Sequence, residues 1–422
     1  MKFNEDNVES NEDNMESNED NTELNEDNME SNEDHIIPLI NYDFVTTPLE
    51  FCVNYSEFHN RSENFLKGCK WSPDGSCLLT NANDNVLRVF DLPLEAYEQP
   101  CLTLPDLTCA LRMAEGETIY DYTWYPKMSS YDAATCCFLS TSRDHPLHLW
   151  DAYTGQIRCS YSCFNHLDEL SPAHSLAFSL NGDLIYCGSK KSVRVFHTSR
   201  PGRDFENRPT FVNKEGQSGI ISCIAMNPYH TDLYAVGSYS RSVGIYEEPS
   251  GYLCFQLKGH HGGITHLQFS LDGNRLFTGG RKDSEILCWD LRQPGVVLCS
   301  MTRQVLTNQR IYFDLDPSGR YLSSGNQDGT INIWDTTLSA QNDEKDSPLP
   351  SLLQFVAHRD AVNGVSFHPT LPLLASSCGQ RLFVTPGRNY DNDNDVDQDP
   401  EEHIMTESSV KLWSLLSRNS TA

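Results

Sequence analysis

Three residues in the middle of the sequence have the types that a hydrolase uses to activate a nucleophile. His260 supplies a base, Thr278 a hydroxyl and Asp283 a carboxylate. Asp283 stands six residues before a tryptophan, however, and Asp328 repeats that spacing. Catalytic residues do not recur along a chain, whereas the hydrogen-bond network of a structural repeat does. The sequence also contains no Walker, HExxH, GxSxG or kinase motif, so we predict no catalytic residue and no enzymatic activity.

Two further patterns have the residue types of metal sites. Cys159 and Cys163 lie near His166, but no second ligand pair stands at a zinc-site spacing. Residues 391–402 place carboxylates where a calcium loop needs them, but valine occupies the position that requires a glycine. We therefore expect neither a metal site nor a cofactor.

The element that must position these residues is a short unit that occurs seven times. The clearest copies alternate apolar and polar residues around Gly turns and end in Trp-Asp, as in GHHGGITHLQFSLDGNRLFTGGRKDSEILCWDLRQ. Units of this kind at roughly 40 to 45 residues are typical of WD-repeat propellers. We predict an all-β fold, a seven-bladed WD-repeat β-propeller over residues 44–417. The units end at Phe90-Asp91, Trp150-Asp151, Phe196-His197, Tyr246-Glu247, Trp289-Asp290, Trp334-Asp335 and Trp413-Ser414.

Closure of the ring needs one more strand than the last unit supplies. Only a few residues follow the final predicted strand, Val410–Leu415. Leu49–Phe58 precedes the first unit and alternates apolar with polar residues. We predict that this segment completes the last blade, because a blade built from both ends of the chain leaves no open edge.

Acidic charge is concentrated in two runs. The formal net charge is −28, of which residues 1–34 contribute −13 and residues 385–409 contribute −7, leaving −8 elsewhere. The first run repeats NEDN every seven residues but has only one apolar position per repeat, which argues against a coiled coil. We predict a disordered acidic tail over residues 1–43, a disordered acidic insertion over 385–409 in the last blade, and a short tail over 418–422.

Cysteine use and hydropathy indicate the compartment. The 15 cysteines are odd in number and form no Cys-x-x-Cys pair. The sequence shows no signal-peptide core and no run of about 18 apolar residues. We expect reduced intracellular thiols and no membrane association.

Cations recur in the loops that open on one face of such a propeller. These are the loops that enter each inner strand and those between the second and third strands. They could hold a phosphate backbone, with tyrosines as stacking faces for bases. From charge alone, solubilising cations paired with neighbouring aspartates explain the pattern equally well. The candidate RNA-binding residues are Lys67, Tyr120, Arg143, Lys190, Lys191, Arg241, Arg281, Lys282, Arg310, Tyr312, Arg359 and Arg381, with Tyr239 beside them.

Longer segments resemble one particular family. ENFLKGCKWSPDGSCLLTNANDNVLRVFDLP, EGETIYDYTWYPKMSS, VRVFHTSRPGRDFE and TNQRIYFDLDPSG are similar to segments of the telomerase Cajal body protein 1 family. The resemblance covers about residues 58–416. Propeller architecture alone does not explain SRPGRD or NQRIYFDLDP.

The resemblance implies an RNA-binding scaffold rather than an enzyme. Family members recognise the Cajal body box of small Cajal-body RNAs and telomerase RNA, and direct these particles to Cajal bodies. The implied partners are those RNAs, the dyskerin-type H/ACA core particle, telomerase and other Cajal-body proteins. Arg143, Arg281, Lys282, Arg310 and Arg381 stand inside matching segments, while Lys190, Lys191 and Arg359 rest on loop position alone.

Two features leave alternatives open. We expect the protein in the nucleus and the Cajal body, with the cytoplasm left open as a second location. Because the sequence has no compact basic nuclear-localisation cluster, we expect import through a partner. A protein-only WD-repeat scaffold or substrate adaptor is the alternative function. Loop-dependent binding of an RNA hairpin separates the two.

Overall fold

The computed structural model describes residues 40–58, 64–98, 106–165, 167–338, 348–381 and 407–416. The chain divides into Met1–Ile37, which is outside the described residues, and Pro38–Ala422. The predictions for most of the tail over 1–43, for nearly all of the insertion and for residues 418–422 also fall outside the described part, as does His166. The boundaries of these segments stay predictions.

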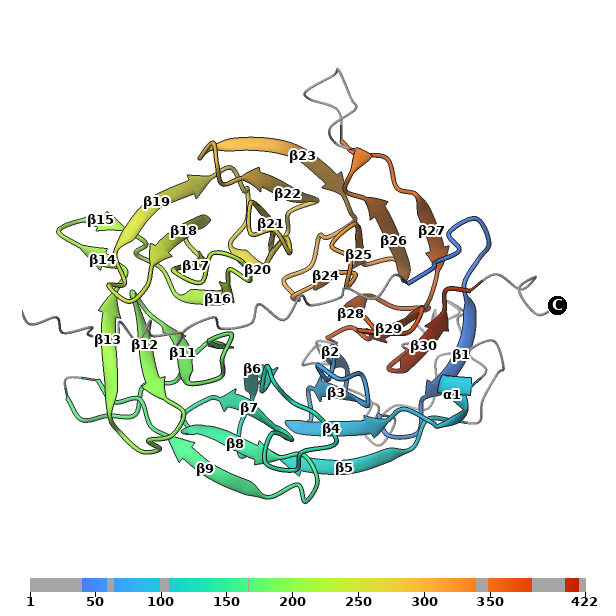
Figure 1. Ribbon diagram of the computed structural model, residues 1–422, viewed down its shortest axis with the longest axis horizontal. Coiled ribbons are helices and arrows are strands. Elements are labelled where there is room, and N and C mark those ends of the chain that lie inside the picture. The colour runs from blue at the N-terminus through green and yellow to red at the C-terminus, as the bar shows by residue number, and fades with distance from the viewer. Residues whose placement is uncertain are drawn as a thin grey trace, which may run out of the picture. The chain divides into compact units, whose positions relative to one another are not determined.

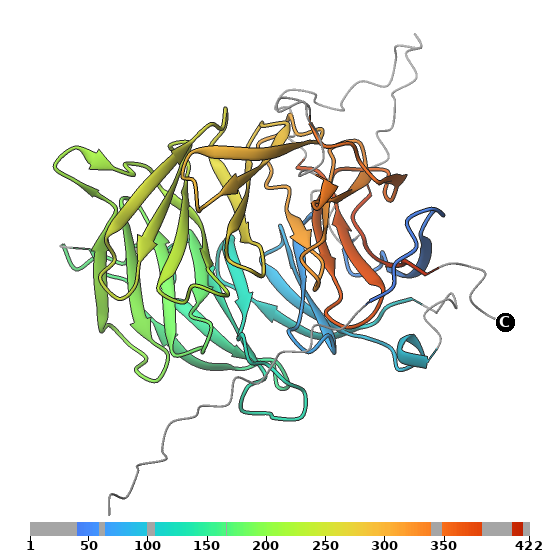
Figure 2. The same ribbon diagram turned by 45° about the horizontal axis from the view of Figure 1, so that its top comes forward.

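Seven four-stranded antiparallel sheets form the blades of a propeller, as predicted (Figure 1). Blade 1 consists of β2 (Leu66–Trp71), β3 (Cys77–Ala82), β4 (Val86–Asp91) and β5 (Cys109–Ala114). Blade 2 consists of β6 (Ile119–Trp124), β7 (Cys137–Ser142), β8 (Leu147–Asp151) and β9 (Ile157–Tyr161). Blade 3 consists of β10 (Ser175–Phe178), β11 (Leu184–Ser189), β12 (Ser192–His197) and β13 (Phe205–Pro209). In Figure 2 the blades are seen from another angle, with their strands side by side around the ring.

Blade 4 consists of β16 (Ile221–Met226), β17 (Leu233–Ser238), β18 (Ser242–Glu247) and β19 (Leu253–Lys258). Blade 5 consists of β20 (Ile264–Phe269), β21 (Arg275–Gly280), β22 (Glu285–Asp290) and β23 (Val296–Thr302). Blade 6 consists of β24 (Phe313–Leu315), β25 (Tyr321–Gly325), β26 (Thr330–Asp335) and β27 (Leu353–Val356). Blade 7 contains β28 (Val362–Phe367), β29 (Leu373–Cys378), β30 (Val410–Ser414) and β1 (Leu49–Asn54). Between β13 and β16 the chain forms a hairpin of β14 (Phe211–Val212) and β15 (Glu215–Gly216). Between β4 and β5 it forms a short helix, α1 (Glu95–Glu98).

Every predicted unit end coincides with the end of a third strand: β4, β8, β12, β18, β22, β26 and β30. The aromatic residue is buried in each, because third strands pack between neighbouring blades. Blades 5 and 6, for example, share a core of Phe277, Cys288, Phe313, Leu322 and Trp334. Each such side chain stabilises the ring by roughly 1.5–3 kcal/mol on burial.

Blade 7 is completed by the start of the propeller sequence, as predicted. β1 pairs with β30 antiparallel, with Leu49 opposite Ser414 and Asn54 opposite Val410. The strand ends at Asn54 rather than Phe58, because the Asn54 amide donates to the carbonyl oxygen of Leu107 at 2.5 Å and the chain then turns. β1 therefore supplies the fourth strand of blade 7, next to β30.

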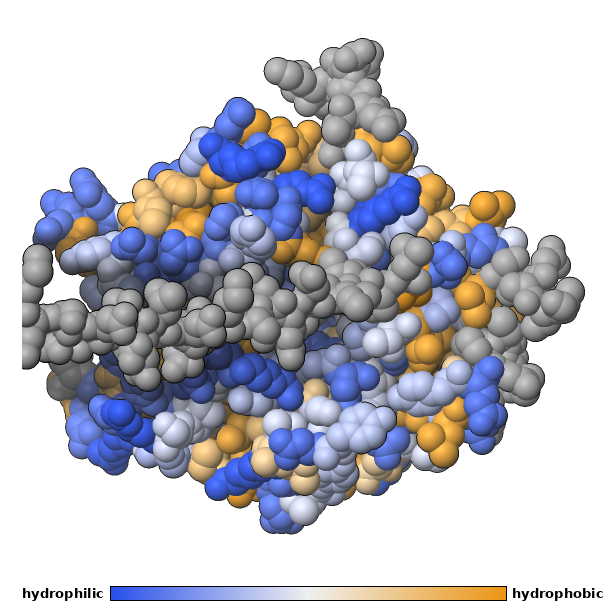
Figure 3. Space-filling model, in the orientation of Figure 1, coloured by the Kyte–Doolittle hydropathy of each residue, from blue (hydrophilic) through white to orange (hydrophobic). Residues whose placement is uncertain are grey.

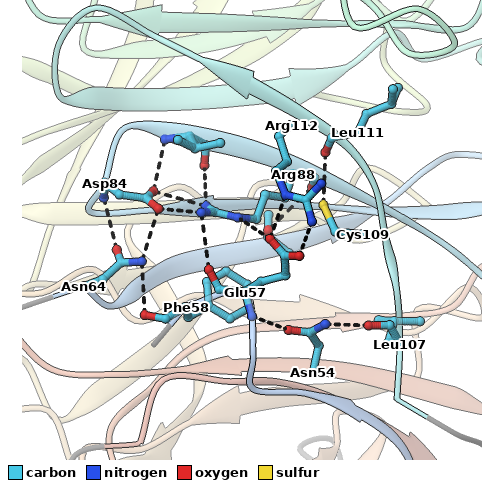
Figure 4. A network of polar contacts seen from close by, with 12 residues as sticks. Asn54, Glu57, Phe58, Asn64, Asp84, Arg88, Leu107, Cys109, Leu111 and Arg112 are labelled. Atoms are coloured by element: carbon cyan, nitrogen blue, oxygen red, sulfur yellow. Dashed lines mark hydrogen bonds and ion pairs between the residues drawn. The ribbon is translucent and has the colours of Figure 1, made fainter. Parts of the chain in front are cut away.

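A polar network fastens the segment after β1 to blade 1 (Figure 4). The buried Arg88 guanidinium forms ion pairs with Asp84 at 2.5 Å and with Glu57 at 3.5 Å. Arg112 on β5 donates to the same Glu57 oxygen, Oε2, through Nε at 2.8 Å, and to Oε1 through a second nitrogen. These arginines lower the pKa of Glu57, with the Arg112 hydrogen bond as the largest cause.

Candidate nucleic-acid interface

The hydrolase-like set in blade 5 is one copy of a repeated hydrogen-bond network. His260 Nδ1 lies 2.8 Å from Asp283 and its Nε2 lies 2.6 Å from the Thr278 hydroxyl, which also accepts the indole N–H of Trp289 at 2.8 Å. All four side chains are buried. The hydroxyl is therefore already occupied by structural partners.

Blades 2 and 7 contain equivalent networks. The indole N–H of Trp413 donates to Ser376 at 2.8 Å, Ser376 lies 2.7 Å from His358 Nε2, and His358 Nδ1 lies 3.0 Å from Glu407. In blade 2 the indole N–H of Trp150 donates to a serine hydroxyl at 2.8 Å. Among the described residues, the bond from tryptophan to a hydroxyl is thus present in three blades, and blades 5 and 7 add a histidine and an acid to it. The predicted copy in blade 6 is not formed, because Asp328 is exposed and bonds Thr330 at 2.6 Å instead.

Among the described residues, one cluster has the composition of a metal site. One ligand atom each of His358, Cys378 and Glu407 lie within 4.8 Å of one another. Both imidazole nitrogens of His358 already have partners, and Lys411 Nζ lies 3.2 Å from the Glu407 carboxylate. These contacts account for the cluster as the blade 7 copy of the network.

A funnel of about 550 Å³ opens where the inner strands begin. We call it the cationic funnel. It brings together seven of the predicted RNA-binding residues and the neighbouring Tyr239. They are Lys67, Tyr120, Arg281, Lys282, Arg310, Tyr312 and Arg381.

The other five candidates lie outside the funnel lining. Arg143 is exposed and forms an ion pair with Asp144 at 3.4 Å. Lys190, Lys191 and Arg241 are exposed on the turns that link the second and third strands of blades 3 and 4. Arg359 is exposed before β28, and only its backbone N–H makes a described hydrogen bond, to Glu407 at 2.8 Å.

Lys67 is the buried charge of the funnel. It lies on β2, and its Nζ is buried without a hydrogen-bond partner among the described residues. Burial lowers its pKa to about 8; Arg381 and Arg310 act in the same direction and Asp84 in the opposite one. The charge of Asp84 thus stabilises the ammonium only in part, and among the described residues no carboxylate forms an ion pair with it.

Arg310 reaches across the axis of the ring. It precedes β24 in blade 6, yet its guanidinium donates to the carbonyl oxygens of Tyr120 and His174, both at 3.4 Å, in blade 2 and before blade 3. It also donates to the Tyr239 hydroxyl of blade 4 at 3.1 Å. Arg281 donates to the same hydroxyl at 3.0 Å, with its guanidinium 4.5 Å from the ring centre. The floor of the funnel is therefore held by groups from several blades.

Turns at the funnel end place cations in an unusual backbone conformation. Lys191, Arg241 and Lys282 have φ angles of 62°, 65° and 51°, in the left-handed region. They occupy the same turn of three consecutive blades, after β11, β17 and β21. Blade 1 has Asn85 at this position, a residue that adopts the conformation at lower cost.

Some funnel residues were not predicted from the sequence. Asn308 and Gln309 line it, and Gln309 Nε2 donates to Asn363 at 2.8 Å and to the carbonyl oxygen of Gly379 at 3.0 Å. They are neutral, so a search for cations and aromatics missed them. The signal was their place in TNQRIYFDLDPSG, a segment that the propeller repeat does not explain.

These features define the class of protein as a WD-repeat β-propeller. The WD40 family, described as WD domain, G-beta repeat, matches residues 52–91, 251–290, 308–335 and 350–384. Over longer stretches, the chain is 54% identical across 351 residues to Telomerase Cajal body protein 1 of Mus musculus, covering 83% of this chain and 65% of that protein. The protein of the same name from Homo sapiens is 51% identical over 376 residues, covering 88% of this chain and 68% of that protein.

The chain belongs to the telomerase Cajal body protein 1 family. A Drosophila melanogaster homolog of the same name is 37% identical over 376 residues, covering 83% of this chain and 66% of that protein. The matched region thus spans about two thirds of the length of these relatives, 65% for the mouse protein. Within the described part of this chain, no helix has the length and apolar character to cross a bilayer.

Proposed function

We propose that this chain is a non-enzymatic scaffold that binds an unpaired RNA loop in the cationic funnel. The observation that carries the proposal is the buried Lys67 ammonium, which has no hydrogen-bond partner among the described residues and faces a cavity shared with Arg281, Lys282 and Arg381. Phosphate oxygens are the ligands that such a group of cations prefers.

The funnel also supports recognition of bases. Tyr120 and the Arg281 guanidinium present planar groups to the cavity, on which unstacked bases of a single strand pack. Asn308 and Gln309 present amides that can hydrogen-bond base edges. Phosphate contacts would position the loop and these few base contacts would give specificity.

The particle that carries the RNA is proposed from the relatives. The names of these relatives refer to telomerase and the Cajal body. We infer that the RNA clients are small Cajal-body RNAs and telomerase RNA, that the chain works beside a dyskerin-type H/ACA core particle, telomerase and other Cajal-body proteins, and that it acts in the nucleus at Cajal bodies.

The test is binding of the full chain to an RNA hairpin that bears the Cajal body box, compared with the same hairpin with a scrambled loop. Binding is measured by fluorescence anisotropy at about 50 and about 200 mM salt. We expect loop-dependent binding that weakens with salt. The double variant Arg281→Glu, Lys282→Glu should bind at least tenfold more weakly, with a salt slope reduced by about 0.7 for each phosphate that it no longer neutralises.

The matched control is Lys127→Glu, Arg200→Glu, which makes the same charge change on exposed residues of turns at the other end of the strands. It should leave binding within twofold of the unchanged chain. Equal binding of both hairpins, or equal losses in the two double variants, would reject the funnel as an RNA site and favour a protein-only scaffold.

A further inference from the structure

A second cavity, of about 770 Å³, lies between blades 1 and 2. We call it the blade 1–2 groove. It is lined by the turn after β2, the residues from Leu92 to Tyr97 after β4, the turn after β6 and the turn after β8. Lys67 at the start of β2 lines the funnel, while Asp74 after the end of β2 lines the groove. The two cavities therefore lie at opposite ends of one strand, roughly 20 Å apart.

The rim of the groove is aromatic and aliphatic. Tyr131 is 100% exposed, Leu94 79%, Tyr153 55% and Tyr97 45%. Single exposed apolar residues are ordinary on a protein surface, but four around one cavity form a patch of the kind that marks an interaction site. In the view of Figure 3, hydrophobic residues also gather in patches toward the outer edge of the propeller.

The groove is already formed by hydrogen bonds between its turns. The Ser130 N–H donates to Asp74 at 2.6 Å, which joins the turn of blade 1 to that of blade 2. The Tyr153 hydroxyl donates to the carbonyl oxygen of Ser130 at 2.6 Å. Arg158 donates to three carbonyl oxygens of the β6–β7 connection, at 2.5 to 3.0 Å. A ligand would thus meet a surface that needs little ordering on binding.

The charge of the groove is opposite to that of the funnel. Among the described residues of its lining, the charged ones are Asp74 and Asp91, and both are acidic. The serine hydroxyls of Ser72 and Ser76 bond Asp74. Asp91 is exposed and has no hydrogen bond or ion pair among the described side chains. Arg158, which bonds the β6–β7 connection, is itself paired with Asp151 at 2.9 Å.

We propose that the blade 1–2 groove is a docking site for a linear peptide of a partner protein that combines arginine or lysine with leucine or aromatic residues. The exposed Asp91 carboxylate would pair with a cation, and the tyrosine faces favour both guanidinium groups and apolar side chains. The part of the lining that the structure describes has two carboxylates and no cation, and would repel a nucleic-acid backbone. A second copy of this chain is disfavoured as well, because its formal charge is −28.

The test uses the full chain and four synthetic 12-residue peptides with alternating Arg-Leu, Glu-Leu, Arg-Gly or Gln-Leu sequences. Binding is followed by anisotropy of a fluorophore on each peptide. We expect the Arg-Leu peptide to bind at least tenfold more tightly than the other three, because only it supplies both the charge and the apolar surface. Tyr131→Ser and Asp91→Lys should each weaken that binding at least tenfold.

Tyr229→Ser and Asp232→Lys are controls with the same changes of side chain, since both residues are exposed on the β16–β17 turn of blade 4, which corresponds to the turn of Tyr131 in blade 2. They should change peptide affinity less than twofold, and the groove variants should leave RNA binding unchanged. Equal losses in groove and control variants would overturn the proposal. So would preference for the Glu-Leu peptide, displacement of the peptide by single-stranded RNA, or Tyr131-dependent self-association in sedimentation.

Discussion

Lys67 is a buried ammonium in the lining of a cavity whose other charged residues are also cations. Its pKa of about 8 lies close to physiological pH, so its charge is sensitive to conditions that leave an ordinary lysine unaffected. Burial among other cations destabilises the charged form of Lys67 in the free protein. The same low-dielectric surroundings would strengthen its attraction to a phosphate in the funnel. Two opposite pH responses follow.

The first prediction concerns RNA affinity. A phosphate favours the protonated amine, so affinity should fall as pH rises from 7 to 9, by up to about tenfold as the amine deprotonates. Lys67→Arg keeps its charge throughout this range and should remove the pH dependence. Hairpin titrations at five pH values measure the effect. An identical pH profile in the two proteins would show that Lys67 does not contact phosphate.

The second prediction concerns stability in the absence of RNA. The unfolded chain holds the Lys67 proton up to about pH 10.5, whereas the folded chain releases it near pH 8. Between these values the unfolded state binds more protons, so the free energy of unfolding should rise with pH relative to a Lys67→Met variant. Urea titrations at pH 7 and pH 10 measure the difference. A constant difference would mean that the amine is not desolvated in the folded state.

Thr278 gives the third prediction. Its hydroxyl serves both His260 and Trp289, and all three are buried. Thr278→Val leaves two buried polar groups without a partner and should cost about 1–3 kcal/mol in the free energy of unfolding. The control is Thr302→Val on the exposed face of β23. Chemical denaturation of both variants should show a large loss only in the first, and equal values would contradict a structural network.

At the scale of the residue, the sequence predicted which cations line the funnel better than it predicted the contacts that they make. Arg281 and Arg310 were chosen by loop position, and both line the funnel. Nothing in the sequence showed that Arg310 crosses to three other blades, because such contacts depend on the curvature of the whole ring. Lys190 and Arg241 satisfied the same loop rule but lie outside the funnel lining, since the rule fixes the end of the strand and not the distance from the axis.

At the scale of the element, the turns between second and third strands hold strained cations. A residue with a side chain costs roughly 1 kcal/mol in the left-handed region, less for asparagine. Arg241 and Lys282 adopt this conformation despite its cost, whereas the corresponding turn of blade 1 has the more tolerant asparagine. Strain that persists in this way is commonly connected with function.

Arg241→Asn therefore gives the fourth prediction. It should raise the free energy of unfolding by about 0.5 kcal/mol, because asparagine adopts the turn more readily. If the turn cation contacts RNA phosphate, the same variant should bind the hairpin severalfold more weakly. Arg200→Asn, an exposed cation outside this row of turns, is the control for both measurements. A stabilised variant with unchanged RNA affinity would assign Arg241 to solubility alone.

Strand prediction succeeded where alternation and aromatic ends recur. All seven third strands end at the predicted residues, because an aromatic side chain is required between every pair of blades. The β14–β15 hairpin was not predicted, since its strands have two residues each and leave no periodic pattern. The β6–β7 connection, which helps to build the groove, also gave no signal in the sequence, because its shape depends on hydrogen bonds to Asp74 of blade 1 and to Arg158 and Tyr153 of blade 2.

At the scale of the whole molecule, ring closure depends on β1. This strand pairs with β30, and Glu57 beyond it pairs with Arg88 and Arg112 of blade 1. The fifth prediction compares a chain that begins at residue 40 with one that begins at residue 58. The second should show a lower Tm and faster proteolysis, since it loses the outer strand and leaves Arg88 buried without Glu57. Equal melting of the two chains would mean that the ring closes without β1.

The position of Arg310 has a topological consequence for any ligand of the funnel. Its guanidinium bonds groups of blades 2 and 4 and the residue that precedes blade 3, and so obstructs the path through the ring. A polymer that enters the funnel must leave by the same opening, and its ends need not thread through the protein. The site therefore suits a bend in the middle of a long chain, whose two arms continue outward together. An RNA could be captured after it has folded and joined its particle, and released without being cut.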